Sequence, residues 1–243
     1  MLKPLGIAIA ASTLMFSTLT AASESIFAQA SRGSFNDAAI TKLFEQQPSL
    51  SASVTFAGTP SNTFKQSIDN GALAFSAVEN STIDGRLVQA TVEAFQQYRL
   101  LSVKAFIQTP IEMCVLVNQQ DVANDTAITM IASHPAALKQ INAWKAGIQP
   151  KELEIPEGTA AAAKLVADRE LPTGTAAIGA CVLDTVYTNL KVVEKGVQDN
   201  KNNKTSFLLM KVEPREQTIS EAEARKELTA AIEMGKKLSK VSQ

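Results

Sequence analysis

Short apolar runs alternate along this chain with segments whose apolar residues recur at helical spacing. A short β-branched or apolar run suits a buried strand, and a segment of helical period suits a helix that covers it. Strands that alternate with helices form mainly parallel sheets flanked by helices, so the predicted class is α/β. The predicted strands cover residues 26–28, 54–56, 73–77, 101–107, 113–117, 127–131, 176–178 and 205–212.

Helical periodicity predicts helices between and after these strands. They begin near Phe35 and Leu87 and cover residues 136–144, 159–166 and 220–238. Ser220 and Glu223 have the spacing of a capping box, which fixes the start of the last helix. The lysines at its other end complement the helix dipole, so we expect a solvated terminal helix there.

With 243 residues, 45% of them hydrophobic, the chain can bury a sizeable core. The 23 Lys and Arg residues nearly balance the 24 Asp and Glu residues, and the lysines are dispersed except near the C-terminus. A nucleic-acid binding protein needs a clustered basic surface. We therefore expect no nucleic-acid partner.

The first 22 residues are typical of a secretory signal peptide. Lys3 is followed by an apolar stretch over 5–19 and by the small residues Thr20-Ala21-Ala22. A membrane anchor is the alternative, but the apolar stretch is shorter than the ~20 residues that cross a bilayer. A second cleavage pattern ends at Ala30, and cutting there would remove the strand predicted over 26–28. We therefore expect cleavage after Ala22 or Ser23, a periplasmic or secreted protein, and no stable membrane insertion afterwards.

Two cysteines, Cys114 and Cys181, remain in the exported chain. An oxidising compartment allows them to form one disulfide. Both lie inside apolar stretches, however, and an unpaired cysteine is often a small buried apolar residue. Of the two interpretations, the sequence favours unpaired buried cysteines.

Hydroxyl and amide side chains gather in four short motifs. They are Ala77-Val78-Glu79-Asn80-Ser81-Thr82, Ser133-His134-Pro135, Gly158-Thr159-Ala160-Ala161 and Asn202-Asn203-Lys204-Thr205-Ser206-Phe207. By residue type, Ser133 and Thr159 are expected to be helix N-caps, each worth about 1 kcal/mol, and Asn80 a turn residue. Capping hydroxyls and the helix N–H groups behind them can also bind a carboxylate.

His134 is the only histidine, and Pro135 follows it. This pattern favours a structural residue at a helix start over a catalytic base. Because no Cys/His cluster has metal-ligand spacing, we expect neither a metal site nor another cofactor. A histidine-based nucleophilic triad is not expected either.

The order and separation of the four motifs resemble those of prephenate dehydratase. The resemblance begins at Gly33-Ser34-Phe35-Asn36, which is similar to the family's Gly-Ser-Phe-Ser segment, and continues to about Val212. It implies two α/β lobes, like those of periplasmic binding proteins, with a ligand cleft between them. Residues 23–101 and 190–243 are expected in lobe I and residues 102–189 in lobe II. A homodimer is also expected, without the regulatory domain that many members carry.

The same resemblance assigns roles in the cleft. Thr205 matches the family's catalytic threonine, which donates a proton or hydrogen bond to the leaving hydroxyl group. Glu79, Phe207 and Ser34 are expected to support the site, and Gln140 to lie on the helix that follows Ser133. The expected substrate-binding residues are Asn80, Ser81, Ser133, Gln140, Thr159, Ala160 and Asn203.

One departure from the family pattern affects the expected activity. The family has Thr-Arg-Phe where this chain has Thr205-Ser206-Phe207. Loss of a buried charged donor can cost about 2 to 5 kcal/mol, so activity is expected to fall a hundredfold or more unless Lys204 or Arg86 replaces the charge. Milder departures are Gly158 in place of serine and Ala77-Val78 in place of Pro-Ile.

Three functions follow from these patterns. The first is an exported prephenate dehydratase that converts prephenate, a small carboxylate, to phenylpyruvate with loss of water and CO2. The second is a non-catalytic periplasmic protein that binds a small anion on the same scaffold, which the missing arginine and the export signal favour. The third is dehydration of arogenate, the amino analogue of prephenate.

Overall fold

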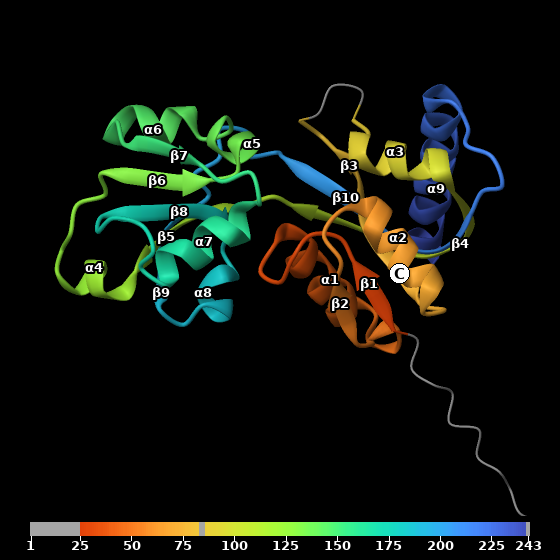
Figure 1. The fold of residues 1–243 in the computed structure, drawn as a ribbon, viewed down its shortest axis with the longest axis horizontal. Coiled ribbons are helices and arrows are strands. Elements are labelled where there is room, and N and C mark those ends of the chain that lie inside the picture. The colour runs from red at the N-terminus through yellow and green to blue at the C-terminus, as the bar shows by residue number, and fades with distance from the viewer. Residues whose placement is uncertain (1–24, 83–85, 242–243) are drawn as a thin grey trace, which may run out of the picture.

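The structure is a computed structural model that describes residues 25–82 and 86–241. The signal peptide predicted over residues 1–22 lies outside the described residues. The chain forms two α/β lobes, each built on one five-stranded sheet (Figure 1). Within the described ranges, the longest helices are too short or too polar to cross a bilayer.

The first sheet has the strand order β2-β1-β3-β10-β4. Strands β2, β1 and β3 are parallel, and β10 runs antiparallel to both of its neighbours, β3 and β4. Four of the five strands therefore share one direction, which confirms the mainly parallel sheet. The strands are β1 (Ile26–Ala28), β2 (Val54–Phe56), β3 (Leu73–Asn80), β4 (Tyr98–Pro110) and β10 (Lys204–Pro214). The helices of this lobe are α1 (Phe35–Gln46), α2 (Pro60–Asp69), α3 (Gln89–Gln97) and α9 (Glu221–Val241), with a 3-10 turn at Pro48–Leu50.

The second sheet repeats this arrangement in the order β7-β6-β8-β5-β9. Strands β7, β6 and β8 are parallel, and β5 is the strand that runs antiparallel to its neighbours. The strands are β5 (Met113–Asn118), β6 (Met130–Ser133), β7 (Lys151–Glu154), β8 (Thr175–Ala180) and β9 (Leu190–Lys195). The helices are α4 (Gln119–Ala123), α5 (Pro135–Leu138), α6 (Asn142–Ile148), α7 (Thr159–Ala167) and α8 (Leu183–Val186).

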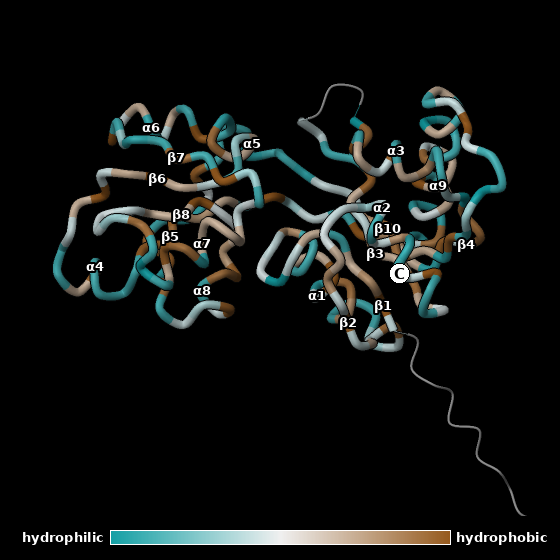
Figure 2. The backbone as a smooth tube through the Cα atoms, in the orientation of Figure 1, coloured by the Kyte–Doolittle hydropathy of each residue, from teal (hydrophilic) through white to brown (hydrophobic). Residues whose placement is uncertain are grey.

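Alternating side chains of the central strands fill separate cores on the two faces of each sheet. On β3, Ala74 and Val78 pack with α2, α3 and α9, whereas Leu73 and Phe75 pack with α1 on the other face. The period of two along a strand is the reason that one strand serves both cores. Apolar segments meet between the sheets and their helices, and the outer loops are mostly hydrophilic (Figure 2). In the second lobe, α5 and α6 lie on one face and α7 and α8 on the other (Figure 1).

The chain crosses between the lobes twice, and both crossings lie later than the predicted boundaries. Strand β4 pairs with β10 as far as Pro110, so residues 102–110 belong to the first sheet. Strand β9 pairs with β5, so residues 190–195 belong to the second. The two crossings are adjacent, because the Ile111 N–H donates to the Asn203 carbonyl at 2.9 Å. Periodicity predicts where a strand lies but not which sheet receives it.

Eight predicted strands overlap strands of the structure, and those over 26–28 and 54–56 have the observed bounds. The sequence missed β7 and β9, edge strands whose residues are largely exposed, so no apolar run marks them. The helix predicted over 136–144 is instead two short helices, α5 and α6, which leave Gln140 in the turn between them. The capping box is confirmed, since Ser220 N donates to Glu223 Oε2 at 3.0 Å and Glu223 N to Ser220 Oγ at 3.3 Å.

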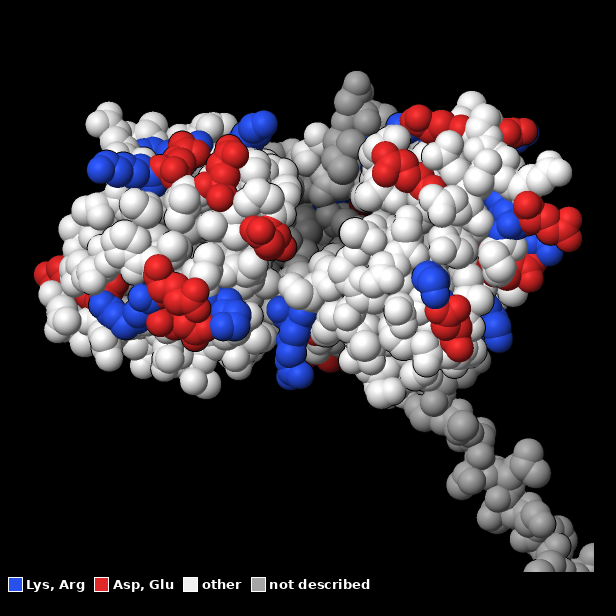
Figure 3. Space-filling model, in the orientation of Figure 1, with Lys and Arg blue, Asp and Glu red and all other residues white. Residues whose placement is uncertain are grey.

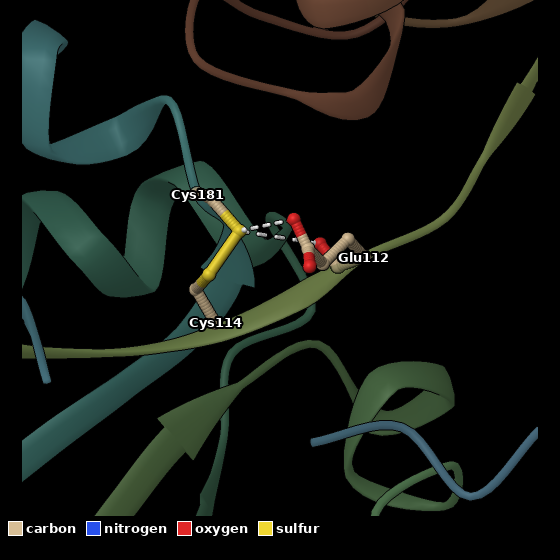
Figure 4. A group of neighbouring side chains, drawn as sticks. All are labelled: Glu112, Cys114 and Cys181. Carbon is tan, nitrogen blue, oxygen red and sulfur yellow. Dashed lines mark hydrogen bonds between the residues drawn. A yellow bond between two sulfur atoms is a disulfide. The ribbon is translucent and has the colours of Figure 1, made fainter. Parts of the chain in front are cut away.

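The expectation of unpaired cysteines is wrong, because Cys114 and Cys181 form a disulfide. Cys114 lies on β5 opposite Gly179 of β8, and Cys181 follows the end of β8, so the two Cα atoms are 5.1 Å apart. Both apolar stretches pack into the same core of the second lobe, and this packing brings the two cysteines together. The sequence analysis had taken the apolar surroundings as favouring unpaired cysteines. Figure 4 shows the bond next to Glu112, at the start of the second lobe.

Removing the disulfide is expected to destabilise the protein. The bond closes a loop of 67 residues, for which loop-closure entropy gives a stabilisation of up to about 4 kcal/mol. The variant Cys114→Ala/Cys181→Ala is expected to lose about 2 to 4 kcal/mol of unfolding free energy in urea titrations. The matched control is the wild type with and without reductant: a reductant that leaves its stability unchanged would contradict the disulfide.

Candidate functional site

A cleft of about 680 Å³ lies between the lobes. Both lobes contribute to its wall. The second crossing supplies Asn203, and the start of β10 supplies Thr205 and Phe207. Most of the residues predicted for the site line this cleft, namely Ser34, Asn80, Gln140, Thr159, Ala160, Asn203, Thr205 and Phe207. Glu79, Ser81 and Ser133 do not line it.

Thr205 lies near the start of β10 and is 7% exposed. Asn80, at the end of the neighbouring strand β3, donates from Nδ2 to Thr205 Oγ1 at 2.7 Å. A hydroxyl that accepts this bond keeps its own hydrogen for another acceptor. Within residues 25–82 and 86–241, no hydrogen bond of the protein uses that hydrogen. Thr205 can therefore donate to a ligand in the cleft.

A chain of side-chain amides joins Thr205 to the second lobe. Asn80 Nδ2 also donates to Asn203 Oδ1 at 3.0 Å, and Asn203 Nδ2 donates to Gln140 Oε1 at 2.8 Å. The Asn80 Oδ1 accepts from the backbone N–H of Thr82 at 2.8 Å, which fixes the orientation of its amide. Each amide thus holds the next, and Gln140 reaches the site from a turn rather than from the predicted helix.

Ser81 stabilises the strand pair and lies outside the cleft wall. Its backbone N–H donates to the Lys204 carbonyl at 2.9 Å, and its Oγ accepts from the Lys204 N–H at 2.9 Å. These bonds continue the pairing of β3 with β10 beyond Asn80. The position of Ser81 therefore supports the geometry of Asn80 and Thr205.

Ser133 is not the N-cap that the sequence predicted. Its side chain is fully buried on β6, where Oγ donates to the Ile178 carbonyl of β8 at 2.6 Å. The cap of α5 is His134, whose Nδ1 accepts from the Ala136 N–H at 3.1 Å. The expected structural role of His134 is thereby confirmed. Ser133 therefore links β6 to β8 and does not line the cleft.

The N-terminus of α7 opens into the cleft without a side-chain cap. Thr159 is the first helical residue rather than the predicted cap, and Gly158 occupies the cap position with φ +119°. This backbone conformation favours glycine, and glycine brings no oxygen to the free N–H groups of the first turn. A carboxylate of a ligand is the natural acceptor for them.

The N-terminus of α1 is capped by its own segment. Ser34 Oγ accepts from the Asp37 N–H at 3.3 Å, and the Asp37 carboxylate accepts from the Gly33 N–H at 2.7 Å. Gly33 has φ +79°, and a Cβ there would lie 2.5 Å from Leu183 Cδ2 of the second lobe. The Gly33-Ser34 segment is therefore a close contact between the lobes at the edge of the cleft.

A family model described as prephenate dehydratase matches residues 26–215. The chain belongs to the prephenate dehydratase family. The matched residues include all four motifs and both crossings between the lobes.

Curated relatives of the dehydratase family match part of the chain. The chain is 31% identical over 146 residues to a prephenate dehydratase of Methanocaldococcus jannaschii, which covers 59% of this chain and 49% of the relative. It is 32% identical over 138 residues to the chloroplastic arogenate dehydratase 5 of Arabidopsis thaliana, which covers 56% of this chain and 31% of the relative. The matches thus span about half and about a third of these relatives.

A solved structure shows the same fold. The prephenate dehydratase of Arthrobacter aurescens, in complex with L-Phe, has a TM-score of 0.63 and 20% sequence identity to this chain, over 81% of this chain and 61% of that one. The two-lobed α/β architecture implied by the motifs is confirmed.

The serine that replaces the family arginine faces away from the cleft. Ser206 is 1% exposed, donates to Glu79 Oε2 at 3.1 Å and accepts from Gln108 Nε2 at 3.1 Å. Two cations lie near the same carboxylate, Arg86 and Lys236, each 3.8 Å from a Glu79 oxygen. A cationic side chain at position 206 would therefore contact Glu79 rather than a ligand in the cleft. The positive charge near Glu79 comes from Arg86, as the sequence analysis allowed, and from Lys236 of α9 rather than from Lys204.

The sequence interpretation missed several residues that line the cleft. Gln29 follows β1, and its Oε1 accepts from Ser76 Oγ at 2.7 Å and from the Ala77 N–H at 3.0 Å. Asn36 and Glu157 also line the wall. Gln29 follows a strand, Asn36 lies in the first turn of a helix and Glu157 precedes a helix. Polar residues at such positions were the signal that could have identified them as cleft residues. Phe207 stacks on Phe75, with ring centroids 5.4 Å apart, and forms an apolar part of the wall.

One group of possible metal ligands lies outside the cleft wall. Ligand atoms of Glu112, Cys114 and Cys181 lie within 4.8 Å of one another (Figure 4). Both sulfur atoms form the disulfide, so neither is available as a thiolate ligand. The expectation that the protein needs no metal or other cofactor stays a prediction.

Asp199 fixes the turn that carries Gln140. Its backbone N–H donates to the Gln140 carbonyl at 2.7 Å, and its carboxylate accepts from the N–H groups of Asn142 and Ala143, each at 2.9 Å. Burial alone raises the pKa of the Asp199 carboxyl, but hydrogen bonds from Ala143 and Asn142, with the charge of Lys145, outweigh it and hold the pKa below its ordinary value.

The Asp199 contact is expected to weaken in acid. Because its pKa is lower in the folded than in the unfolded state, the carboxyl stabilises the fold above its unfolded pKa and loses that contribution as pH falls through the folded value. The variant Asp199→Asn is expected to show a smaller difference in unfolding free energy between pH 7 and pH 3 than the wild type. Urea titrations at both pH values measure it, and an unchanged difference would contradict this role.

Removal of the Ser206 hydroxyl is expected to affect stability more than ligand affinity. The variant Ser206→Ala leaves Glu79 and Gln108 without their shared partner, at a cost of about 1 to 2 kcal/mol. Since Ser206 lies outside the cleft wall, the KM for an anionic substrate is expected to change less than about twofold, because no charge in the cleft is altered. A large rise in KM would show that Ser206 acts on the ligand.

Proposed function

We propose that this chain converts prephenate, or its amino analogue arogenate, to an aromatic product with loss of water and CO2. The observation that carries the proposal is the hydroxyl of Thr205, which Asn80 holds as an acceptor and thereby leaves free to donate into the cleft. Membership in the prephenate dehydratase family supports the same reaction class. The proposal makes the protein a carbon–oxygen lyase that needs no cofactor.

The protein forms no covalent bond with the substrate in this reaction. The bond between the ring and its carboxylate breaks, and that electron pair enters the ring as the opposite C–O bond breaks. CO2 leaves, and the departing hydroxide takes up one proton to give water. Prephenate then gives phenylpyruvate, and arogenate gives phenylalanine. A donor that strengthens its hydrogen bond as the oxygen becomes negative lowers the barrier, and Thr205 is assigned to this step.

The rest of the wall suits the other parts of such a substrate. The uncapped N-terminus of α7 at Gly158, Thr159 and Ala160 offers N–H groups for a carboxylate. The apolar side chains of Ile111, Met113 and Phe207 line the same cleft. An apolar surface favours a planar aromatic product and solvates a departing carboxylate poorly, which favours loss of CO2.

We also propose that the protein is exported. The signal pattern over residues 1–22 is the basis of this proposal, and the disulfide between Cys114 and Cys181 agrees with an oxidising compartment.

On the face drawn in Figure 3, acidic and basic side chains are interspersed over both lobes. The homodimer, the absence of nucleic-acid partners and the absence of membrane insertion after cleavage stay predictions.

A binding protein without turnover is the second candidate. The serine at position 206 and the export pattern favour it, because an exported two-lobed protein can hold a small anion between its lobes without chemistry. Turnover separates the two candidates.

Thr205→Ala is expected to reduce kcat at least about a hundredfold, because it removes the proposed donor. Thr205→Ser, which keeps a hydroxyl, is the matched control and is expected to retain turnover. Product formation from both substrates by the purified mature protein measures this, with binding followed by calorimetry.

The outcomes separate the candidates. Wild-type turnover in Thr205→Ala would contradict the assignment of Thr205. Saturable binding without turnover in the wild type would make the chain a binding protein.

A further inference from the structure

Gln29 follows β1 in the first lobe, and its side-chain amide is held in one orientation. Oε1 accepts from Ser76 Oγ at 2.7 Å and from the Ala77 N–H at 3.0 Å. Because the backbone N–H of Ala77 can only donate, the amide atom that faces it is the oxygen and not the nitrogen. Both bonds use Oε1, so the two hydrogens of Nε2 are left for other partners.

The Nε2 atom of Gln29 is accessible and has no acceptor within the described part of the chain. Gln29 lines the cleft and is half-buried. In residues 25–82 and 86–241, the fully buried side-chain atoms that lack a hydrogen-bond partner are Asn36 Oδ1 and Glu213 Oε1, and Nε2 of Gln29 is not one of them. A ligand in the cleft can therefore reach it. Since the amide is already fixed through its oxygen, it loses little further freedom when it donates.

The wall around Gln29 favours a negative group but offers uncharged donors for it. Among the described residues that line the cleft there is no lysine or arginine. Helix α3 begins without a side-chain cap, and its residues Val88 and Ala90 line the wall. Its first turn is joined to the same segment as Gln29, since Thr91 Oγ1 donates to the Ala77 carbonyl at 2.6 Å. The partial positive charge of this helix start favours an anion near the Gln29 amide.

Gln29 and Thr205 lie on opposite sides of strand β3. Because β3 separates β1 from β10, two strand spacings, about 10 Å, lie between the strands that carry them. Thr205 is assigned to the leaving hydroxyl group. On the opposite ring carbon, prephenate and arogenate carry the departing carboxylate and a side chain that ends in a second carboxylate. A donor across β3 from Thr205 is therefore placed for this other end of the substrate.

We propose that Gln29 is a substrate-binding residue whose Nε2 donates to the carboxylate that remains in the product. The proposal rests on the proposed function and assigns one more contact in the same cleft. A donor to the departing carboxylate would hinder the loss of CO2, because that group leaves most readily when it is poorly solvated. The retained carboxylate keeps its charge throughout the reaction. Its bond to Gln29 is equally strong in the substrate and in the transition state, so it lowers KM and leaves kcat unchanged.

This contact gives each lobe a donor for the substrate. The uncapped start of α7 offers N–H groups from the second lobe, and Gln29 offers Nε2 from the first. An ionised carboxylate has two oxygens and about four acceptor sites, so one group can accept from both lobes.

Two substitutions separate this role from a purely structural one. Gln29→Glu keeps an oxygen that accepts from Ser76 and Ala77 but has no N–H donor. Gln29→Met has a similar length and no charge, and it loses both the donor and the acceptor. A hydrogen bond to a charged group corresponds to about tenfold or more in affinity. In both variants, KM and Kd for prephenate and arogenate are therefore expected to rise at least about tenfold, while kcat stays within about threefold of the wild type.

Thr175→Val is the matched control for a loss of stability alone. It removes a buried hydrogen bond, from Thr175 Oγ1 to the Pro172 carbonyl at 2.6 Å, and Thr175 lies outside the cleft wall. Its urea midpoint is expected to fall as that of Gln29→Met does, with KM and Kd unchanged. Kinetics and calorimetry on the purified mature protein give these values, and circular dichroism checks that each variant folds.

The outcomes separate this proposal from the proposed function. A rise in KM and Kd in both Gln29 variants, with kcat retained, supports it. Wild-type KM in Gln29→Glu would show that Oε1 alone matters, and wild-type KM in Gln29→Met would show that the charge of glutamate alone acts. Either result, or a loss of kcat at unchanged KM, overturns the proposal and leaves the dehydratase function intact.

If the wild type turns over neither substrate, the proposed function fails and the Kd values for prephenate decide. Binding that is at least about tenfold weaker in both Gln29 variants supports the contact, and equal binding in either variant overturns it. If the wild type binds neither substrate, both proposals fail.

Discussion

The hydrogen bond from Asn80 to Thr205 joins the ends of two neighbouring strands, and the site is arranged around it. It exists because β10 returns from the second lobe and inserts antiparallel between β3 and β4. That insertion places Thr205 opposite Asn80 and brings Asn203 within reach of Gln140 in the other lobe. The amide chain therefore links the position of the proposed donor to the relative position of the lobes.

Apolar runs predicted the α/β class, because buried strands leave such runs. The two lobes and most of the cleft residues were implied by the resemblance of the motifs to the prephenate dehydratase family. The edge strands β7 and β9 were missed because they bury little and so leave no such run. The predicted caps at Ser133 and Thr159 were wrong for a related reason. The residue type indicates the end of an element but does not fix which of two adjacent residues takes the cap, and His134 and Gly158 took it.

The effect of replacing the family's arginine by Ser206 depends on which way the side chain at position 206 points. From the sequence, Ser206 removed a charge from the site. In the fold, residues that alternate along β10 face opposite sides, so Thr205 lines the cleft while Ser206 bonds Glu79 and Gln108 behind it. The disulfide depended in the same way on strand register, since Cys114 and Cys181 are distant in sequence and meet only because β5 pairs with β8. Neither feature is encoded in local sequence.

A double-mutant cycle between Asn80 and Thr205 tests the central claim most directly. Turnover is measured under single-turnover conditions for Asn80→Ala, Thr205→Ala and the double variant. If Asn80 acts by holding the Thr205 hydroxyl, the second substitution should cost little once the first is made, so the losses are far from additive. Additive losses in ΔΔG‡ would show that the two residues act independently, and would contradict the role given to their hydrogen bond.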